Sequence, residues 1–141
     1  MTQQQISLVT LGVDDLARSR RFYGEGFGWR PIYENSEISF FRMNGLMLGL
    51  WLKPKLAADM QKEADGNFHA FALAHNVPQQ DDVTPLLERL AAHGGSILRD
   101  ADAPPHGGFR GYIADPDNHI WEIAYNPAWS VDEEGRVTFG T

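Results

Sequence analysis

The sequence predicts an α+β fold in which two copies of a βαβββ module form one domain of 141 residues. Short runs rich in β-branched and aromatic residues outnumber the helix-like segments. Each half of the chain also has the same order of features: a strand, a pair of aspartates, an amphipathic helix, glycine, and then further strands. We therefore expect modules over residues 6–52 and 68–127.

The first module begins with an apolar strand over residues 6–13, and Asp14 or Asp15 is expected to cap the following helix. That helix should run to about Gly24, because further glycines follow it. Short strands are expected over 30–34, 38–43 and 46–52. Asn44-Gly45 lies between the last two and is typical of a hairpin turn.

Residues 53–67 are rich in charged and small residues and are expected to be a linker, with room for a short helix. The second module should have a strand over 68–74, a helix capped by Asp81-Asp82 and ended by Gly94-Gly95, and a short strand over 96–99. A loop over 101–108 precedes a hairpin of strands 109–114 and 119–125. Residues 128–141 form a tail with a possible edge strand over 137–139.

Composition narrows the classes of function. The formal net charge is -7, which argues against binding nucleic acid through its phosphates. The chain has no Cys, so disulfides and thiolate metal ligands are excluded. The longest apolar run, residues 45–52, is too short to span a membrane, and residues 1–5 do not resemble a secretory signal. We expect a cytoplasmic protein without nucleic-acid or membrane partners.

Glu122 interrupts an otherwise apolar and aromatic strand, because it lies between Trp121 and Ile123. A carboxylate on a buried face is costly unless it is paired, protonated or bound to a metal. Glu122 is therefore a candidate functional residue. Two simpler interpretations remain open: a carboxylate on the outer face of the sheet, or an ion pair with Arg110 or Arg42.

Three motifs together carry a resemblance to a known family. They are the segment 13–19 followed by Phe22-Tyr23, the segment 107–112, and the segment Asp115-Pro116-Asp117-Asn118-His119-Ile120-Trp121-Glu122. The chain resembles the vicinal oxygen chelate superfamily, which contains glyoxalase I, extradiol dioxygenases, fosfomycin-resistance enzymes and bleomycin-resistance proteins. The resemblance implies that each module curls a mixed sheet around a shared cavity. It also implies a homodimer in which modules pair across subunits.

The resemblance also implies where metal ligands would lie. In metal-using members of the family, the first and last strands of each module supply one ligand each. The second module places His69 and Glu122 at these positions, whereas the first module places Leu8 and Gly49 there, and neither of these can bind a metal. We expect a reduced site whose divalent cation (Ni, Zn, Mn or Fe) is weakly bound or absent.

Alternation along the strands predicts which side chains share a face with His69 and Glu122. The expected substrate pocket is mostly apolar, and His106 lies in a loop near its mouth. Its predicted lining is Thr10, Met47, Trp51, Phe71 and Ile120.

The expected function is that of a small-molecule enzyme of the glyoxalase/dioxygenase superfamily, of the lyase, isomerase or dioxygenase type. His69 and Glu122 would hold a cation or act as base and acid near an oxygen-bearing substrate. One alternative is a metal-free small-molecule or drug-binding protein of the bleomycin-resistance type. A degenerate module with a structural role is the other.

Overall fold

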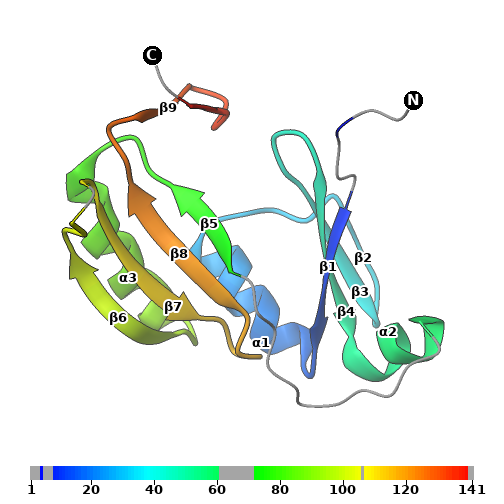
Figure 1. Ribbon diagram of the computed structural model, residues 1–141. Helices are drawn as coiled ribbons and strands as arrows, with labels where there is room; N and C mark the ends of the chain where they lie inside the picture. The colour runs from blue at the N-terminus through cyan, green and yellow to red at the C-terminus, as the bar shows by residue number, and fades with distance from the viewer. Residues whose placement is uncertain (1–3, 5–7, 61–71, 106, 140–141) are drawn as a thin grey trace.

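The computed structural model describes residue 4 and residues 8–60, 72–105 and 107–139. It contains two four-stranded mixed sheets with equivalent strand orders, β1-β4-β3-β2 and β5-β8-β7-β6 (Figure 1). In each sheet the first strand of the module pairs in parallel with the last, and the other pairs are antiparallel. This arrangement confirms the predicted α+β fold of two βαβββ modules. The strands are β1 (Leu8–Val13), β2 (Tyr33–Glu34), β3 (Ile38–Arg42), β4 (Met47–Leu52), β5 (Leu73–Asn76), β6 (Ser96–Asp102), β7 (Phe109–Ala114) and β8 (Ile120–Tyr125).

The described residues contain three α-helices: α1 (Leu16–Arg20), α2 (Lys53–Met60) and α3 (Val83–Ala92). Asp15 caps α1, since its carboxylate accepts a hydrogen bond from the backbone N–H of Arg18 at 3.2 Å. After α1 the chain continues as a π-helical turn over Arg21–Gly26. A 3₁₀ turn precedes α3, and Asp82 there makes no side-chain capping bond, contrary to expectation.

Several strand boundaries differ from the sequence prediction. β2 begins at Tyr33 rather than at Arg30, because only Tyr33 and Glu34 pair with β3, and β3, β4 and β8 are each one residue shorter than expected. β5 runs to Asn76 rather than ending at Ala74, because residues 73–76 pair with residues 121–124 of β8. This pairing outweighs the low strand preference of the polar residues His75 and Asn76. The expected start of this strand lies outside the described residues. β6 continues to Asp102, into the expected loop, because Asp102 pairs with Arg110 of β7. The tail forms a hairpin of β9 (Trp129–Val131) and β10 (Val137–Phe139), of which only β10 was expected.

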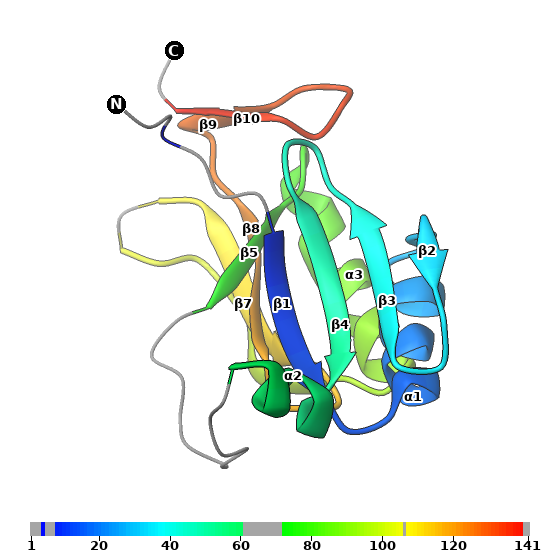
Figure 2. The same ribbon diagram turned by 90° about the vertical axis from the view of Figure 1, so that its right-hand side faces the viewer.

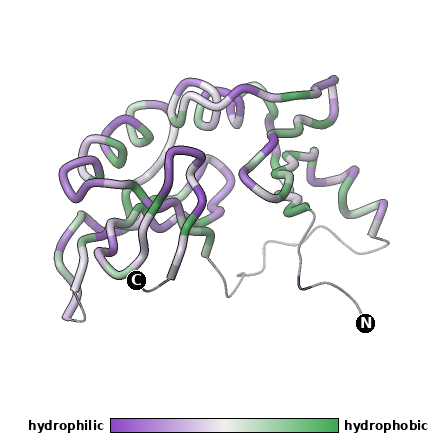
Figure 3. The backbone as a smooth tube through the Cα atoms, turned by 90° about the horizontal axis from the view of Figure 1, so that it is seen from above, coloured by the Kyte–Doolittle hydropathy of each residue, from purple (hydrophilic) through white to green (hydrophobic). Residues whose placement is uncertain are grey.

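One hydrophobic core joins the two modules. In Figure 1, α1 lies between the two sheets, with α3 against the second; in Figure 2, α1 lies behind β2 and β3 of the first sheet. Phe22 and Tyr23, from the π-helical turn, are fully buried and belong to the same cluster as Phe41 of the first sheet and Ile123 of the second. Along the tube of Figure 3, apolar and polar segments alternate, as expected for elements with one buried face.

The turn between β7 and β8 fastens the second module to the first. The carboxylate of Asp117 accepts hydrogen bonds from the Asp14 N–H (2.8 Å), the Arg18 guanidinium (2.7 Å) and the Ser19 hydroxyl (3.3 Å). The side chain of Asp117 is fully buried, whereas that of Arg18 is 43% exposed. We call these four residues the inter-module clasp.

A buried hydrogen-bond chain lies beside the clasp. The Tyr23 hydroxyl donates to Asp115 Oδ2 at 2.7 Å and accepts from Trp121 Nε1 at 3.1 Å. The other oxygen of Asp115 accepts from the backbone N–H groups of Asp117 and His119, both at 2.8 Å. Burial raises the pKa of Tyr23 and also that of Asp115. These hydrogen bonds therefore link the helical segment of the first module to the hairpin formed by the last two strands of the second module.

Among the helices that the structure describes, none combines the length and the apolar character needed to cross a membrane.

Candidate functional site

Glu122 lies in the middle of β8, on the face of the second sheet that points away from the core. Its neighbours on either side, Trp121 and Ile123, belong to the core, so alternation directs Glu122 outward. It lies opposite Tyr112 of β7 and Ala74 of β5. The Tyr112 hydroxyl donates to Glu122 Oε2 over a long 3.5 Å, and the carboxylate is half-buried. The outer-face interpretation therefore describes its position in the single chain.

An ionic cluster lies near Glu122 on the same sheet. Asp102 accepts hydrogen bonds from Arg99 and Arg110, and these bonds lower the pKa of its carboxyl, with Arg99 the larger cause. The Arg110 side chain is only 13% exposed. Because Arg110 is held by Asp102, and Arg42 belongs to β3 of the other sheet, neither forms an ion pair with Glu122 in the described part of the chain. Sequence reasoning missed Tyr112 as a partner, although its register opposite Glu122 follows from the β7–β8 hairpin.

The first module has no metal-binding side chains at the two implied ligand positions. Leu8 is 42% exposed on the edge strand of its sheet. Gly49 is covered by Phe40, since a Cβ atom added at Gly49 would lie 3.1 Å from the Phe40 ring. Within residues 8–60, 72–105 and 107–139, no group of three or more His, Asp or Glu side chains could hold a metal ion. Glu122 is the one implied ligand that the described residues supply, so they do not fit a three- or four-ligand centre.

The remaining second-module predictions fall on residues that the structure does not describe. His69, Phe71 and His106 all lie outside the described ranges. The strand register bears on the equivalence of the modules, because Gly49 pairs with Thr10 and Glu122 pairs with Ala74. Thr10 lies two residues after Leu8, and Ala74 lies two residues after Ala72. If Gly49 and Glu122 occupy equivalent positions, Ala72 is therefore the equivalent of Leu8, and it lies three residues after His69. Ligation by His69 stays a prediction.

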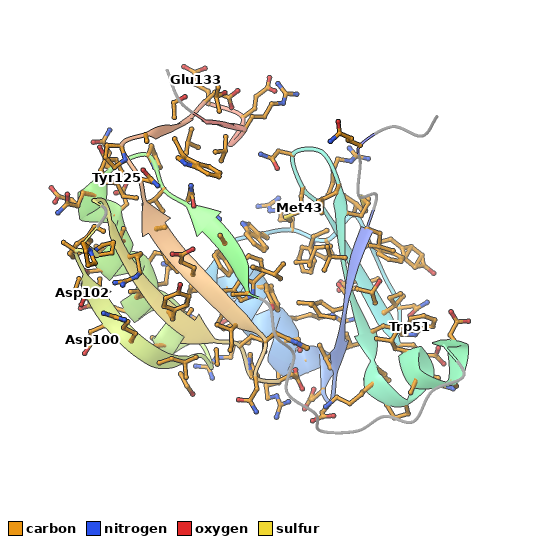
Figure 4. The ribbon with its side chains drawn as sticks, in the orientation of Figure 1. Met43, Trp51, Asp100, Asp102, Tyr125 and Glu133 are labelled. Atoms are coloured by element: carbon orange, nitrogen blue, oxygen red, sulfur yellow. The ribbon has the colours of Figure 1, made fainter. Side chains whose placement is uncertain are left out.

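The predicted pocket residues of the first module do not face Glu122 within one chain. Thr10, Met47 and Trp51 alternate with the core residues Leu11, Leu48 and Leu50, so they occupy the outer face of the first sheet. Figure 4 shows Trp51 on the side away from the second module. Ile120 shares the outer face of the second sheet with Glu122. The structure thus divides the predicted pocket into two half-exposed outer faces that point away from each other.

A cavity of about 490 Å³ lies instead between the modules, on the inner side of both sheets. Trp29, Phe41 and Trp121 form part of its wall, together with His75. Sequence reasoning assigned no partner to His75. Once the register of β5 is known, the pairing of Ala74 with Glu122 places Ala74 on the same face as Glu122. Alternation along the strand then places the next residue, His75, on the inner face.

Comparisons with known proteins agree with this fold. A model of the Glyoxalase/Bleomycin resistance protein/Dioxygenase superfamily matches residues 5–123. A crystal structure of a glyoxalase-related enzyme from Fulvimarina pelagi is 54% identical, covers 99% of this chain and 100% of that chain, and has a TM-score of 0.95. Metallothiol transferase FosB of Lysinibacillus sphaericus is 25% identical over 125 residues, which span 87% of this chain and 83% of the relative. Fosfomycin resistance protein FosX of Listeria monocytogenes is 28% identical over 121 residues, 84% of this chain and 86% of the relative.

Proposed function

Because the chain belongs to the Glyoxalase/Bleomycin resistance protein/Dioxygenase superfamily, we propose that it is a small-molecule enzyme in which Glu122 moves a proton on an oxygen-bearing substrate. The observation that carries this proposal is the half-buried Glu122 carboxylate, which has a phenol and no cation as its described partner. Relatives whose names denote a metallothiol transferase and a glyoxalase-related enzyme support an enzymatic class.

The geometry suits general base and acid chemistry of the isomerase or lyase type. The carboxylate of Glu122 takes a proton from a carbon beside a carbonyl group and returns it to a neighbouring atom. Tyr112 positions that carboxylate through its hydroxyl. Arg110 lies two residues from Tyr112 along β7, so its partly screened positive charge lies near the anion that forms. His69, if it joins this face, is a second proton-transfer group.

Metal dependence is a separate question, since the described residues do not supply a complete ligand set. We therefore route no step through a metal. Mass-spectrometric metal analysis of the purified protein, after loading with Ni, Zn, Mn and Fe, tests the expected weak site. Stoichiometric metal that a His69→Ala, Glu122→Ala double variant loses would support a reduced chelate centre. Absence of metal from both proteins would rule out that centre.

We also propose that two copies associate so that the outer face of the first sheet in one subunit covers the outer face of the second sheet in the other. Exposed or half-exposed apolar side chains on the first of these faces, such as Leu8, Met47 and Trp51, support this. The substrate would then lie between the two faces. Light scattering after size exclusion should give a dimer mass for the wild type and a monomer mass for Met47→Arg. An exposed-site control, Glu25→Arg, should remain dimeric.

Deuterium exchange tests the chemistry without knowledge of the natural substrate. A panel of small hydroxycarbonyl compounds and thiol adducts is incubated with the protein in D₂O and followed by proton NMR. The wild type should catalyse exchange for at least one member, and Glu122→Gln should be slower by about 10²–10⁴-fold. Tyr112→Phe should slow exchange less, because it removes a positioning hydrogen bond. Glu133→Gln, in the exposed hairpin, is the matched control. Unchanged exchange in Glu122→Gln would refute the proposal.

One observation favours a second function, that of a metal-free binding protein. Phe40 fills the space over Gly49, so the first sheet presents an apolar surface where a ligand side chain would otherwise project. A binding protein should show ligand-dependent increases in melting temperature without turnover. Calorimetric titrations with cationic drugs and with fosfomycin, which is named in one relative, distinguish it from the enzyme: heat of binding without product formation supports sequestration.

A further inference from the structure

The cavity between the modules is separate from the face that carries Glu122. Val9 and Leu48 of the first sheet and Leu73 and Trp121 of the second line it, and all four belong to inner, core-directed faces. Its volume of about 490 Å³ lies within the range of small-molecule sites. Figure 4 shows Met43, another lining residue, directed into the space between the modules.

Three aromatic side chains meet at steep angles in this wall. The Trp29 ring lies 6.3 Å from Phe41 at an interplanar angle of 60°, and 5.8 Å from Trp121 at 64°. Phe27 stacks on Trp29 at 4.1 Å and 13°, which holds the indole in place. A corner of fixed rings presents both faces and edges, so it suits a flat apolar molecule.

Four polar side chains line the same cavity without a side-chain hydrogen-bond or ionic partner among the described residues: Arg30, Arg42, His75 and Asn76. The His75 ring lies 5.2 Å from the Phe27 ring and 6.0 Å from the Trp29 ring, measured between centroids. Burial lowers the pKa of His75, so the imidazole is neutral near pH 7 and offers one donor and one acceptor. Arg30 is exposed and carries an unneutralised guanidinium. It is a local positive charge in a protein whose formal net charge is -7.

The C-terminal hairpin covers one side of the cavity. Glu134, Gly135 and Val137 line it, although they follow β8 in the chain. The Asn44 side-chain amide, in the turn between β3 and β4, donates to the Gly135 carbonyl and so joins the hairpin to the first module. Figure 2 shows the hairpin lying above the open ends of the sheets. Both modules and the hairpin therefore contribute to the wall of the cavity.

We propose that the inter-module cavity binds a flat, apolar small molecule with one anionic group, whose body packs against Trp29, Phe41 and Trp121 and whose charged end reaches Arg30 and His75. This site is independent of the reaction proposed at Glu122, because the two lie on opposite faces of the second sheet. Its ligand class is that of aromatic carboxylates, sulfonates and phosphates. The binding site requires one chain only.

The test uses two fluorescent probes of similar shape, the anionic 8-anilinonaphthalene-1-sulfonate and the neutral N-phenyl-1-naphthylamine. Both should bind the wild type, and Met43→Trp, which fills the cavity, should abolish binding of both. Leu98→Trp is the control, because it adds an indole at an exposed position of β6 that does not line the cavity. It should leave both affinities within twofold. The reverse result, with Leu98→Trp weakening the probes and Met43→Trp not, would overturn the proposal, as would a wild type that binds neither.

Charge recognition has its own variant, chosen at an exposed position so that folding is unaffected. Arg30→Gln should weaken the anionic probe by about tenfold, the size expected for one charge-assisted contact, and leave the neutral probe unchanged. Equal effects on the two probes would overturn the assignment of Arg30. Glu122→Gln should bind both probes like the wild type, so failure of this proposal and failure of the Glu122 reaction are distinguishable.

Discussion

Replacing Tyr23 by Phe removes one hydroxyl from the chain of buried hydrogen bonds between the modules. In the native protein this hydroxyl donates a hydrogen bond to Asp115 Oδ2 and accepts one from Trp121 Nε1, and all three residues are at most 5% exposed. A buried polar group left without its partner costs about 1–3 kcal/mol, more when it is charged. Two such groups appear together here, so we expect a loss of about 3 kcal/mol in the free energy of unfolding. For a chain of this size, that corresponds to a fall of about 10 °C in melting temperature.

Urea titration followed by circular dichroism at pH 7 measures this loss, with thermal melts as a second readout. Tyr33→Phe is the matched control, because Tyr33 is 52% exposed and its hydroxyl only accepts a bond from Asn35 at 3.2 Å. The control should lie within about 0.5 kcal/mol of the wild type. A Tyr23→Phe protein as stable as the control would refute the reasoning, since the hydrogen bonds would then contribute nothing beyond ring packing.

Three further predictions concern other parts of the same core. Asp117→Ala should lower stability by about 2–4 kcal/mol in urea titrations, because it removes the acceptor for Arg18 and two other donors; a loss below about 0.5 kcal/mol would contradict the importance of the clasp. Gly111→Ala should lower the melting temperature by several degrees, since the added Cβ would lie 2.5 Å from Leu87 Cδ1 and 2.9 Å from the Arg99 carbonyl oxygen and cost about 1–3 kcal/mol; an unchanged melt would contradict this close packing. The lowered pKa of His75 means that the folded state binds fewer protons than the unfolded state below pH 6.5, so stability present above that pH is lost as the pH falls. His75→Gln should therefore flatten the decline in stability between pH 7.5 and pH 5.5, and equal slopes in both proteins would contradict this.

Local patterns predicted the strands well because each strand is bounded by turn residues with a clear backbone preference. Asn44-Gly45 and Asp115-Pro116 marked two hairpins, and β7 was predicted over its whole length. β5 was misplaced, because its end depends on a parallel partner that is distant in the chain. The sequence prediction ended this strand at Ala74, and the ladder with β8 shows that His75 and Asn76 belong to it.

The candidate site was harder to predict, for a geometric reason. Alternation along Met47-Leu48 and along Trp121-Glu122 separates the two faces of each strand correctly. It does not say which face of one sheet meets which face of the other. That depends on where α1 lies, between the sheets, and on Tyr23 and Asp115, which are 92 residues apart in the chain.

The shared core has a consequence for how the protein folds. The two modules repeat one topology, yet neither has a separate hydrophobic core. Phe22 and Tyr23 of the first module pack in the same core as Ile113 and Trp121 of the second. Duplication in sequence therefore need not mean two folding units. We expect a single cooperative unfolding transition with coincident fluorescence and dichroism curves. A separately expressed half should remain largely unfolded until it is mixed with the other half.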